Sequence, residues 1–413
     1  MSNPRLRTVD EAVALILDRA RPLEPRLVDS PLTLGLILAE PIVADIDLPP
    51  FAKALMDGYA VRSGDFPTGG DYRRRVVDSI MAGRISDRAI EPGEVAQIMT
   101  GAPLPPGADS VINVERTQVS PNDPDHVTLT VPTGISPGQF VLPRGRELRQ
   151  GDRLLGPGTK INAGMIGLIG SAGRGVVRVV PLPSVAVVST GDELVPVERS
   201  PGPGQIRNTN GPMLTALANH WNDRVATELP TVPDRAEDLI ASLRPTLETA
   251  DVLIISGGVS AGIKDLVPAA LLELGVEPVF HKVAVKPGKP ICFGVGPQRS
   301  SGRPGTLVFG LPGNPASCVV GFLLFVRPAL DALAGRGASP APVEQARLGA
   351  SFRHRGHRPT YHPARWRDGQ LVPQDWAGSA DLRTVALADG FAVFDAGDRD
   401  YAVGDEVGFL RLF

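Results

Sequence analysis

Three short apolar runs in the second half of the chain each end in a glycine-rich polar turn. The runs cover residues 185–188, 252–255 and 307–309, and the turns after them read STGDE, SGGVSAGIKD and GLPGNPAS. Short β-branched runs are typical of strands buried on both faces. Where helices connect such strands, the strands are parallel and ligands bind beyond their carboxyl ends. The sequence therefore predicts one crevice, lined by Asp192, Glu193, Ser260, Asp265 and Asn314.

The rest of the chain predicts several further parts, since 413 residues exceed the usual size of a single core. Thr8 to Glu11 form a capping-box pattern before apolar residues at helical spacing, which predicts an opening helix. Short alternating runs predict mostly strands between residues 40 and 180. Helices are expected at 161–170, at 212–220 and after Pro315, and a small β domain is expected after the Pro- and Ala-rich linker that follows Gly335.

Composition argues against several classes of protein. A net charge of −3 gives no general attraction to nucleic acid or to an anionic membrane. Cys292 and Cys318 have no paired spacing of the zinc or redox type, which favours a reducing compartment, and we expect the cytosol. The N-terminus lacks the apolar core of a signal peptide, and the longest apolar stretch, 316–326, is too short to span a bilayer and is expected to be a buried helix.

The turn after residue 255 has the composition of an anion site. Its glycines let backbone N–H groups face a phosphate, and a helix beginning at Lys264 or Asp265 would add its positive end. A tight β-to-α turn without a ligand remains the alternative. Carboxylates beside a phosphate usually hold a hard cation such as Mg²⁺, and the candidate ligands are Asp192, Glu193 and Asp265.

Other polar residues are weaker signals. Lys286 and Lys289 in KPGKP would hold an oxyanion, or would form a solvated hairpin tip. Asn314 begins a helix in GLPGNP, where its amide and nearby N–H groups would face a ligand. The histidines at 354, 357 and 362 fit no zinc pattern, and a basic anion patch with the neighbouring arginines is favoured. Cys318 is expected in the core, and no order of residues supports acyl transfer.

Taken together, MDGYAVR (56–62), QIMTGAPLPPGAD (97–109) and the four motifs above resemble the molybdenum insertases, the MoeA-type molybdopterin molybdenumtransferases. The order and spacing match over nearly the whole chain. The central segment alone is also similar to the molybdopterin adenylyltransferases and to a nucleotide-pyrophosphatase-like family. The resemblance implies a multidomain α/β plus β fold: a discontinuous linker and dimerisation domain (1–50 and 140–178), a β-rich arm (51–139), a central doubly wound molybdopterin-binding-like α/β domain (179–333) and a small C-terminal β domain (338–413).

The resemblance also implies a reaction and its partners. Adenylylated molybdopterin and molybdate would be the substrates, the pyrophosphate would be cleaved with Mg²⁺, and AMP would be released. The protein would be a homodimer in which the central domain of one subunit faces the arm of the other. A molybdopterin adenylyltransferase and recipient molybdoenzymes would be further partners. The alternatives are a catalytically weak paralogue that binds and delivers the cofactor, and a nucleotide pyrophosphatase.

By motif position, the resemblance assigns roles to individual residues. Asp265 and Asp192 would orient metal and pyrophosphate, while Gly257, Gly258 and Ser260 would cradle phosphate. Asp57 and Thr100 would act from the arm of the partner subunit. Residues that would shape the molybdate pocket are Lys286, Pro287, Arg358 and Ser379, and further cofactor-binding residues would be Gly191, Lys289, Asn314 and Ser317. Met165 departs from the family pattern, because an acid is expected in its helix.

Overall fold

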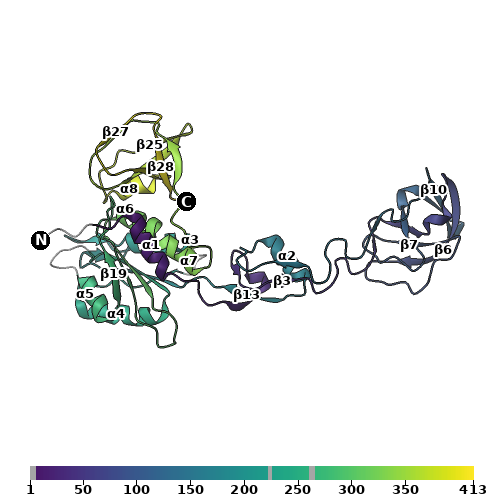
Figure 1. The fold of residues 1–413 in the computed structure, drawn as a ribbon, viewed down its shortest axis with the longest axis horizontal. Helices are drawn as coiled ribbons and strands as arrows, with labels where there is room; N and C mark the ends of the chain where they lie inside the picture. The colour runs from purple at the N-terminus through teal and green to yellow at the C-terminus, as the bar shows by residue number, and fades with distance from the viewer. Residues whose placement is uncertain (1–5, 222–225, 260–265) are drawn as a thin grey trace. The chain divides into compact units, whose positions relative to one another are not determined.

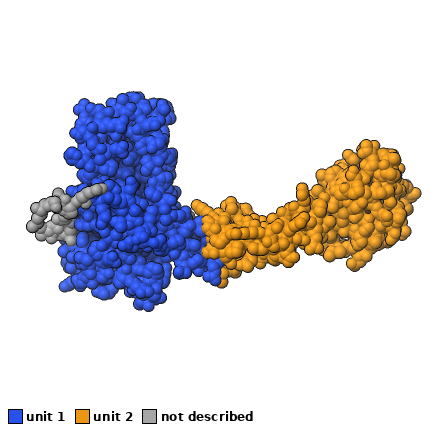
Figure 2. Space-filling model, viewed as in Figure 1, with its two compact units in different colours: residues 1–26, 35–37, 178–413 blue, residues 27–34, 38–177 orange. Residues whose placement is uncertain are grey.

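The computed structural model describes residues 6–221, 226–259 and 266–413, so the predicted site residues Ser260 and Asp265 lie outside the described residues. The chain forms two compact units (Figures 1 and 2). Unit 1 comprises residues 1–26, 35–37 and 178–413, and unit 2 comprises residues 27–34 and 38–177. The four domain boundaries given above are finer than this division and stay a prediction.

A six-stranded sheet forms the centre of unit 1, with the order β17-β14-β18-β21-β20-β19. Its parallel strands are β14 (Val185–Ser189), β17 (Ala226–Glu228), β18 (Val252–Ser256) and β21 (Leu307–Leu311). The three predicted strands are therefore confirmed as parallel neighbours. The sheet edge of β19 (Glu277–His281) and β20 (Cys292–Val295) is antiparallel, because a direct loop rather than a crossover helix joins the two strands.

Helices cover both faces of this sheet, as expected of a doubly wound domain (Figure 1). Alternate residues of one strand divide between two cores: Ile254 packs with one set of helices, and Ile255 packs with the other. The first set is α1 (Val9–Arg19), α3 (Asn210–Trp221), α6 (Pro315–Gly321) and α7 (Arg327–Leu333), and the second is α4 (Ala236–Thr249) and α5 (Leu266–Glu273). α4 was not predicted from the sequence, and it contains Pro245.

The opening helix has the predicted cap. The Thr8 hydroxyl accepts the Glu11 N–H at 3.1 Å, and the Glu11 carboxylate accepts the Thr8 N–H at 2.8 Å. These two bonds satisfy donors that the first turn of a helix otherwise leaves unpaired, and the capping box is confirmed.

The apolar helix after Asn314 is longer than predicted. α6, the π-helical turn η4 (Phe322–Val326) and α7 form one run, Pro315–Leu333. By length and composition alone these 19 residues could cross a membrane, and no other described helix meets that test. However, 89% of its most apolar 18-residue stretch is buried inside the protein, which is typical of a core helix. The expectation of a buried helix is confirmed, whereas the expectation that the segment is too short was wrong.

The C-terminal part of unit 1 is the expected small β structure. Its five-stranded sheet has the order β22-β28-β26-β24-β25, and a short pair of strands and one helix accompany it. The elements are β22 (Glu344–Arg347), β23 (Phe352–His354), β24 (Thr360–Arg367), β25 (Gln370–Pro373), α8 (Leu382–Ala386), β26 (Gly390–Phe394), β27 (Arg399–Tyr401) and β28 (Glu406–Arg411). The His354 and His362 rings hydrogen-bond within this structure, to Gly397 O and Gln374 O.

Unit 2 is mostly strand, as predicted. Its largest sheet has the order β8-β5-β7-β6-β10-β9. These strands are β5 (Gly58–Val61), β6 (Gly70–Ile80), β7 (Glu94–Ile98), β8 (Ser110–Asn113), β9 (Thr117–Ser120) and β10 (Asp123–Val131). The predicted helix at 161–170 is confirmed as α2 (Ala163–Ser171), where the Asn162 side chain caps the N–H of Met165 at 2.9 Å. Met165, the departure from the family pattern, is half-buried in this helix.

Candidate active site

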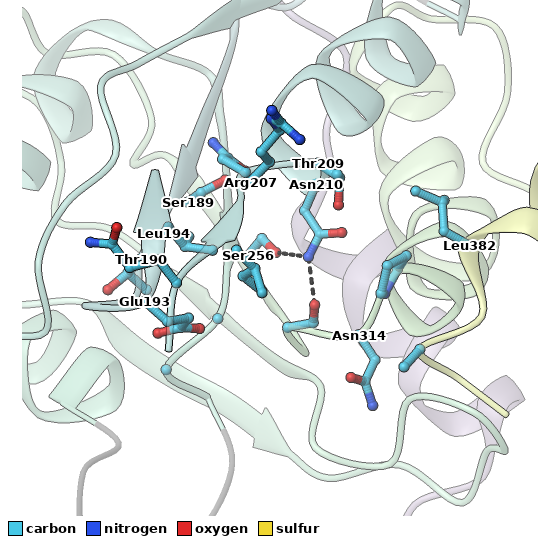
Figure 3. A pocket seen from close by; sticks show the side chains of 18 of the residues that line it. Ser189, Thr190, Glu193, Leu194, Arg207, Thr209, Asn210, Ser256, Asn314 and Leu382 are labelled. Atoms are coloured by element: carbon cyan, nitrogen blue, oxygen red, sulfur yellow. Dashed lines mark hydrogen bonds between the residues drawn. The ribbon is translucent and has the colours of Figure 1, made fainter. Parts of the chain in front are cut away.

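A pocket of about 640 Å³ lies at the carboxyl ends of β14, β18 and β21 (Figure 3). The predicted residues Glu193, Gly257, Gly258 and Asn314 line it. Backbone hydrogen bonds hold the three turns together, from Thr190 N to Ser256 O at 2.9 Å and from Gly257 N to Leu311 O at 3.0 Å. The expected crevice is therefore present, and it brings together turns that are far apart in the sequence.

Two glycines give the turn after β18 its shape. Gly257 has φ +99° and Gly258 has φ +62°, a region that residues with side chains rarely adopt. A Cβ on Gly257 would lie 2.3 Å from Thr190 O, which is closer than any contact allows. The backbone of this turn therefore depends on glycine both for its conformation and for space.

Asn210 is a pocket residue that the sequence analysis missed. Its amide Nδ2 donates to Ser256 Oγ at 2.9 Å and to Gly313 O at 2.7 Å (Figure 3). Its Oδ1 and the hydroxyl of Ser189 are buried without a hydrogen-bond partner among the described residues. Leaving such a group unpaired costs about 1–3 kcal/mol, a cost that a polar ligand would remove. The segment Asn208–Asn210 carries only the ordinary pattern of a helix start, so no sequence pattern singles out Asn210 as a ligand-binding residue.

The carboxylates near the pocket form a short chain of contacts. Asp192 Oδ1 accepts the Asp234 N–H at 3.1 Å, and Asp234 Oδ1 accepts the Thr190 hydroxyl at 2.6 Å. Glu193 and Asp234 line the pocket. Asp234 was not predicted, because it follows no apolar strand and no glycine-rich turn. Gly191 is buried beside these residues.

The carboxylates fit Mg²⁺ only as a partial ligand set. Among the described residues, no group of three His, Cys, Asp or Glu side chains is placed to hold a metal ion. Proteins often bind Mg²⁺ through one or two carboxylates, with substrate phosphates completing the coordination. Glu193 and Asp234, which both line the pocket, meet that smaller requirement; Asp192 contacts Asp234 but is not among the described residues that line the pocket.

A cationic cluster, Lys286 and Arg358, comes from two distant segments of the same unit. The Lys286 N–H donates to Pro359 O at 2.9 Å, and the Tyr361 N–H donates to Lys286 O at 2.7 Å. Arg358 Nη1 donates to Val285 O at 2.8 Å, so both predicted cations sit on the seam between the KPGKP loop and the C-terminal sheet. Pro287 is buried in this loop.

Asn314 connects the pocket to Ser379. It lines the pocket, and its Nδ2 donates to Ser379 Oγ at 2.8 Å. The backbone carbonyl of Ser379 also accepts the Ala316 N–H at 3.1 Å. The first turn of α6 is thereby fixed against the C-terminal part of the chain.

Other predicted residues lie less directly at the pocket. Ser317 is 3% exposed inside α6 and is not among the described residues that line the pocket. Lys289 is exposed, and its carbonyl accepts the Val283 N–H at 3.0 Å. The predicted basic patch is smaller than expected, because Arg353 and Arg355 both pair with Asp400.

Two titratable groups behind the site have shifted pKa values. Burial lowers the pKa of His362, and the positive charge of Lys286 lowers it further, so the ring is neutral beside the cationic cluster. Burial raises the pKa of the Cys318 thiol to about 12, and its Sγ donates to Pro312 O at 2.8 Å. Cys318 is therefore a core residue, as expected, and it does not ionise near neutral pH.

Asp57 and Thr100 contact each other in unit 2. The N–H and the hydroxyl of Thr100 both donate to Asp57 Oδ1 at 2.7 Å. These hydrogen bonds, first from the hydroxyl and then from the N–H, lower the pKa of Asp57 below its usual range. Asp57 and Thr100, to which the resemblance assigns a shared role, are therefore in direct contact, and the contact favours the ionised form of Asp57.

We expect Thr100→Val to raise the pKa of Asp57 toward its usual range, because the hydroxyl donor is lost. Since the folded-state pKa is lowered, the Asp57 contact stabilises the fold above the usual aspartate pKa and is lost as the pH falls through the lowered value. An NMR titration of the Asp57 carboxyl carbon measures the change. Thr130→Val, which removes a hydroxyl bonded to Asp71 in the same unit, is the control. An unchanged Asp57 pKa in Thr100→Val would contradict the assignment.

Comparisons with known proteins agree with this geometry. Family models match three successive segments: the MoeA N-terminal region (domain I and II) over residues 7–173, a "Probable molybdopterin binding domain" over 186–332, and the MoeA C-terminal region (domain IV) over 345–412. The molybdopterin molybdenumtransferase of Staphylococcus epidermidis is 32% identical over 407 residues, which is 97% of this chain and 94% of that protein. The chain belongs to the MoeA family.

Further relatives of this MoeA family member match it over nearly its full length. The molybdopterin molybdenumtransferase of Staphylococcus aureus is 32% identical over 412 residues, covering 97% of the chain and 94% of the relative. A solved structure of the molybdopterin biosynthesis MoeA protein from Pyrococcus horikoshii has a TM-score of 0.81 at 31% identity, and it covers 99% of this chain and 100% of that one. The predicted family and fold class are confirmed.

Proposed function

We propose that this MoeA family member is a molybdopterin molybdenumtransferase of molybdenum cofactor biosynthesis. It takes adenylylated molybdopterin and molybdate, cleaves the pyrophosphate, releases AMP and leaves molybdenum on the dithiolene sulfurs. The observation that carries this proposal is the pocket at the carboxyl ends of β14, β18 and β21, where a glycine turn suited to phosphate lies in the same unit as a cationic loop. Its similarity to curated transferases over 97% of the chain supports the same reaction.

The pocket residues would divide the substrates between them. Backbone N–H groups at Gly257 and Gly258 would hold the pyrophosphate, because such turns present several donors to an anion. The unpartnered Asn210 Oδ1 would accept a hydrogen bond from the organic part of the substrate. Lys286 and Arg358 would hold molybdate, since a desolvated dianion needs roughly two matching charges or strong donors.

We further propose Mg²⁺ as the cofactor, held by Asp192, Glu193 or Asp234 together with Asp265. When bound, the ion would withdraw charge from the phosphate oxygens at the bond that breaks. Asp234 would also keep the first turn in place, because it accepts the Thr190 hydroxyl while its N–H donates to Asp192.

The wider assembly is also part of the proposal. We propose a cytosolic homodimer with the four domains given above, in which Asp57 and Thr100 of one subunit act at the site of the other. The ionised Asp57 supports a polar role for that pair. An adenylyltransferase would supply the substrate, and recipient molybdoenzymes would take the product.

The two alternative functions are not favoured. A nucleotide pyrophosphatase that shares only the central domain would not require the MoeA N-terminal region, which matches residues 7–173. A carrier without catalysis would use the phosphate turn but would not require carboxylates beside it to hold Mg²⁺.

The deciding experiment is AMP release from adenylylated molybdopterin by the purified full-length chain. We expect release that molybdate stimulates and that chelation of Mg²⁺ abolishes. Reactions without protein and without molybdate are the controls, and pterin binding is measured in parallel by equilibrium dialysis. Tight binding of the pterin without AMP release would refute the transferase and favour the carrier.

A further inference from the structure

A second cavity, of about 720 Å³, lies at the opposite end of the central sheet. Asp251, which directly precedes β18, and Leu307, the first residue of β21, both line it. Since β18 and β21 are parallel, this cavity is at their amino ends, whereas the candidate active site is at their carboxyl ends. Five residues of strand rise about 17 Å, so the two sites are separate. Every residue that lines the second cavity belongs to unit 1.

The lining of this amino-end cavity is strongly basic. Its arginines come from two segments, the end of α1 with the chain after it and the loop between β20 and β21. Its only described carboxylates are Glu24 and Asp251, and they face five arginines: Arg19, Arg21, Arg26, Arg299 and Arg303. Arg19 and Arg21 also share the neighbouring Asp18. The charge that remains favours an anionic ligand.

Arg299 gives the most specific indication. It is 4% exposed, and its Nη2 donates to Ala250 O at 2.7 Å and to Asp251 Oδ1 at 3.0 Å. Its Nε and Nη1 have no hydrogen-bond partner among the described residues. Buried guanidinium donors are normally paired, so this side chain is one acceptor group short.

Both carboxylate oxygens of Asp251 already accept hydrogen bonds from other groups, so Asp251 does not supply the acceptor that Arg299 Nε and Nη1 lack. Its Oδ1 also accepts Arg303 Nη2 at 2.7 Å, and its Oδ2 accepts both the N–H and the hydroxyl of Ser184 at 2.9 Å. One carboxylate therefore serves two guanidinium groups and a serine. A second anion beside Arg299 and Arg303 would balance the charge and supply acceptors.

The loop that carries the two arginines is held in place without a ligand. Glu248 Oε2 accepts the N–H of Ser300 at 3.0 Å and its hydroxyl at 2.7 Å. The Arg299 N–H donates to Arg303 O at 3.1 Å, and the Thr306 hydroxyl donates to Ala250 O at 2.7 Å. A fixed loop loses little conformational freedom when a ligand binds, which favours affinity.

The rest of the lining is apolar and would suit an organic group. It includes Pro22, Leu23, Pro304, Leu307 and Leu333. Cavities of about 300–1,000 Å³ are typical of small-molecule sites.

We propose that the amino-end cavity binds a small organic phosphate, with its phosphoryl group at Arg299 and Arg303 and its organic part against the leucines and prolines. Guanidinium groups suit this role because their planar N–H pairs match phosphate oxygens. The proposal does not depend on the transferase activity.

The test is calorimetric titration of the full-length chain with phenyl phosphate and, separately, with inorganic phosphate. Arg303→Met is the main variant, because half of the Arg303 side chain is exposed and the Arg299 to Asp251 pair is retained without it. Arg347→Met, an exposed arginine paired with Glu406, is the matched control. We expect Arg303→Met to weaken phenyl phosphate binding at least tenfold and Arg347→Met to leave it unchanged.

The outcomes separate the possible ligands and sites. Tighter binding of phenyl phosphate than of inorganic phosphate supports an organic phosphate, and equal binding supports free phosphate at the same arginines. The titration is repeated in Gly257→Ala, where the Arg303-dependent binding should persist, because that glycine belongs to the other pocket. Equal affinity in Arg303→Met and the unmodified chain, or no binding of either probe, would overturn the proposal.

Discussion

Replacing Lys286 with methionine is expected to lower molybdate-stimulated AMP release by about 10- to 100-fold at low molybdate concentration. A hydrogen bond to a charged group contributes about 1.5–3 kcal/mol, which corresponds to that range. Methionine keeps much of the length of the side chain and removes the charge. Because Lys286 is held through its backbone, by Pro359 O and the Tyr361 N–H, the loop should keep its position in the variant.

In Lys286→Met, the fall in AMP release should appear mainly as an increase in the molybdate concentration that gives half-maximal stimulation. Pterin binding, measured by equilibrium dialysis, should be nearly unchanged, because the phosphate turn is formed by other residues. Lys160→Met, at an exposed position in unit 2, removes an equal charge and is the control for net charge. A molybdate dependence identical to that of the unmodified chain would exclude Lys286 from the oxyanion site.

The position of the pocket was predictable from local sequence patterns. Each apolar run was short and bounded by glycines, and the rule that ligands bind beyond the carboxyl ends of parallel strands then placed Glu193 and Asn314 correctly. The sequence does not show that β20 runs antiparallel to β21. A strand carries the same apolar pattern whether its partner is parallel or antiparallel.

Residues whose role depends on tertiary packing were not predictable in this way. Asp234 reaches the pocket because the segment before α4 folds back against β14, where the Val232 N–H bonds Ser189 O at 2.9 Å. Asn210 looked like an ordinary helix start. Ser317, proposed from the family resemblance as a cofactor-binding residue, is buried among apolar residues of α6, and its role stays a prediction. Arg358 and Ser379 were proposed only through the family resemblance, and their site roles stay a prediction. Their contacts, Arg358 with Val285 O and Ser379 with Asn314, depend on how the C-terminal part of the chain packs.

Replacing Gly257 with alanine is expected to reduce AMP release by about 100-fold. The alanine Cβ would lie 2.3 Å from Thr190 O, and its backbone would have to keep φ +99°. Strained backbone of this kind costs about 1–3 kcal/mol, and relief requires the turn to move away from β14. A displacement of about 1 Å near reacting groups can lower a rate by about 10²-fold.

Gly313→Ala is the matched control, because Gly313 also lines the pocket. A Cβ there would have no described atom closer than Gly257 Cα at 4.0 Å, an ordinary contact, so we expect a change of less than threefold. Circular dichroism and thermal unfolding of both variants show whether the fold is retained. Folded Gly257→Ala that releases AMP at the unmodified rate would mean that the turn after β18 does not hold the pyrophosphate. The phosphate would then have to bind elsewhere in the pocket, where the unpartnered hydroxyl of Ser189 and the side chains of Arg207 and Thr209 are possible donors.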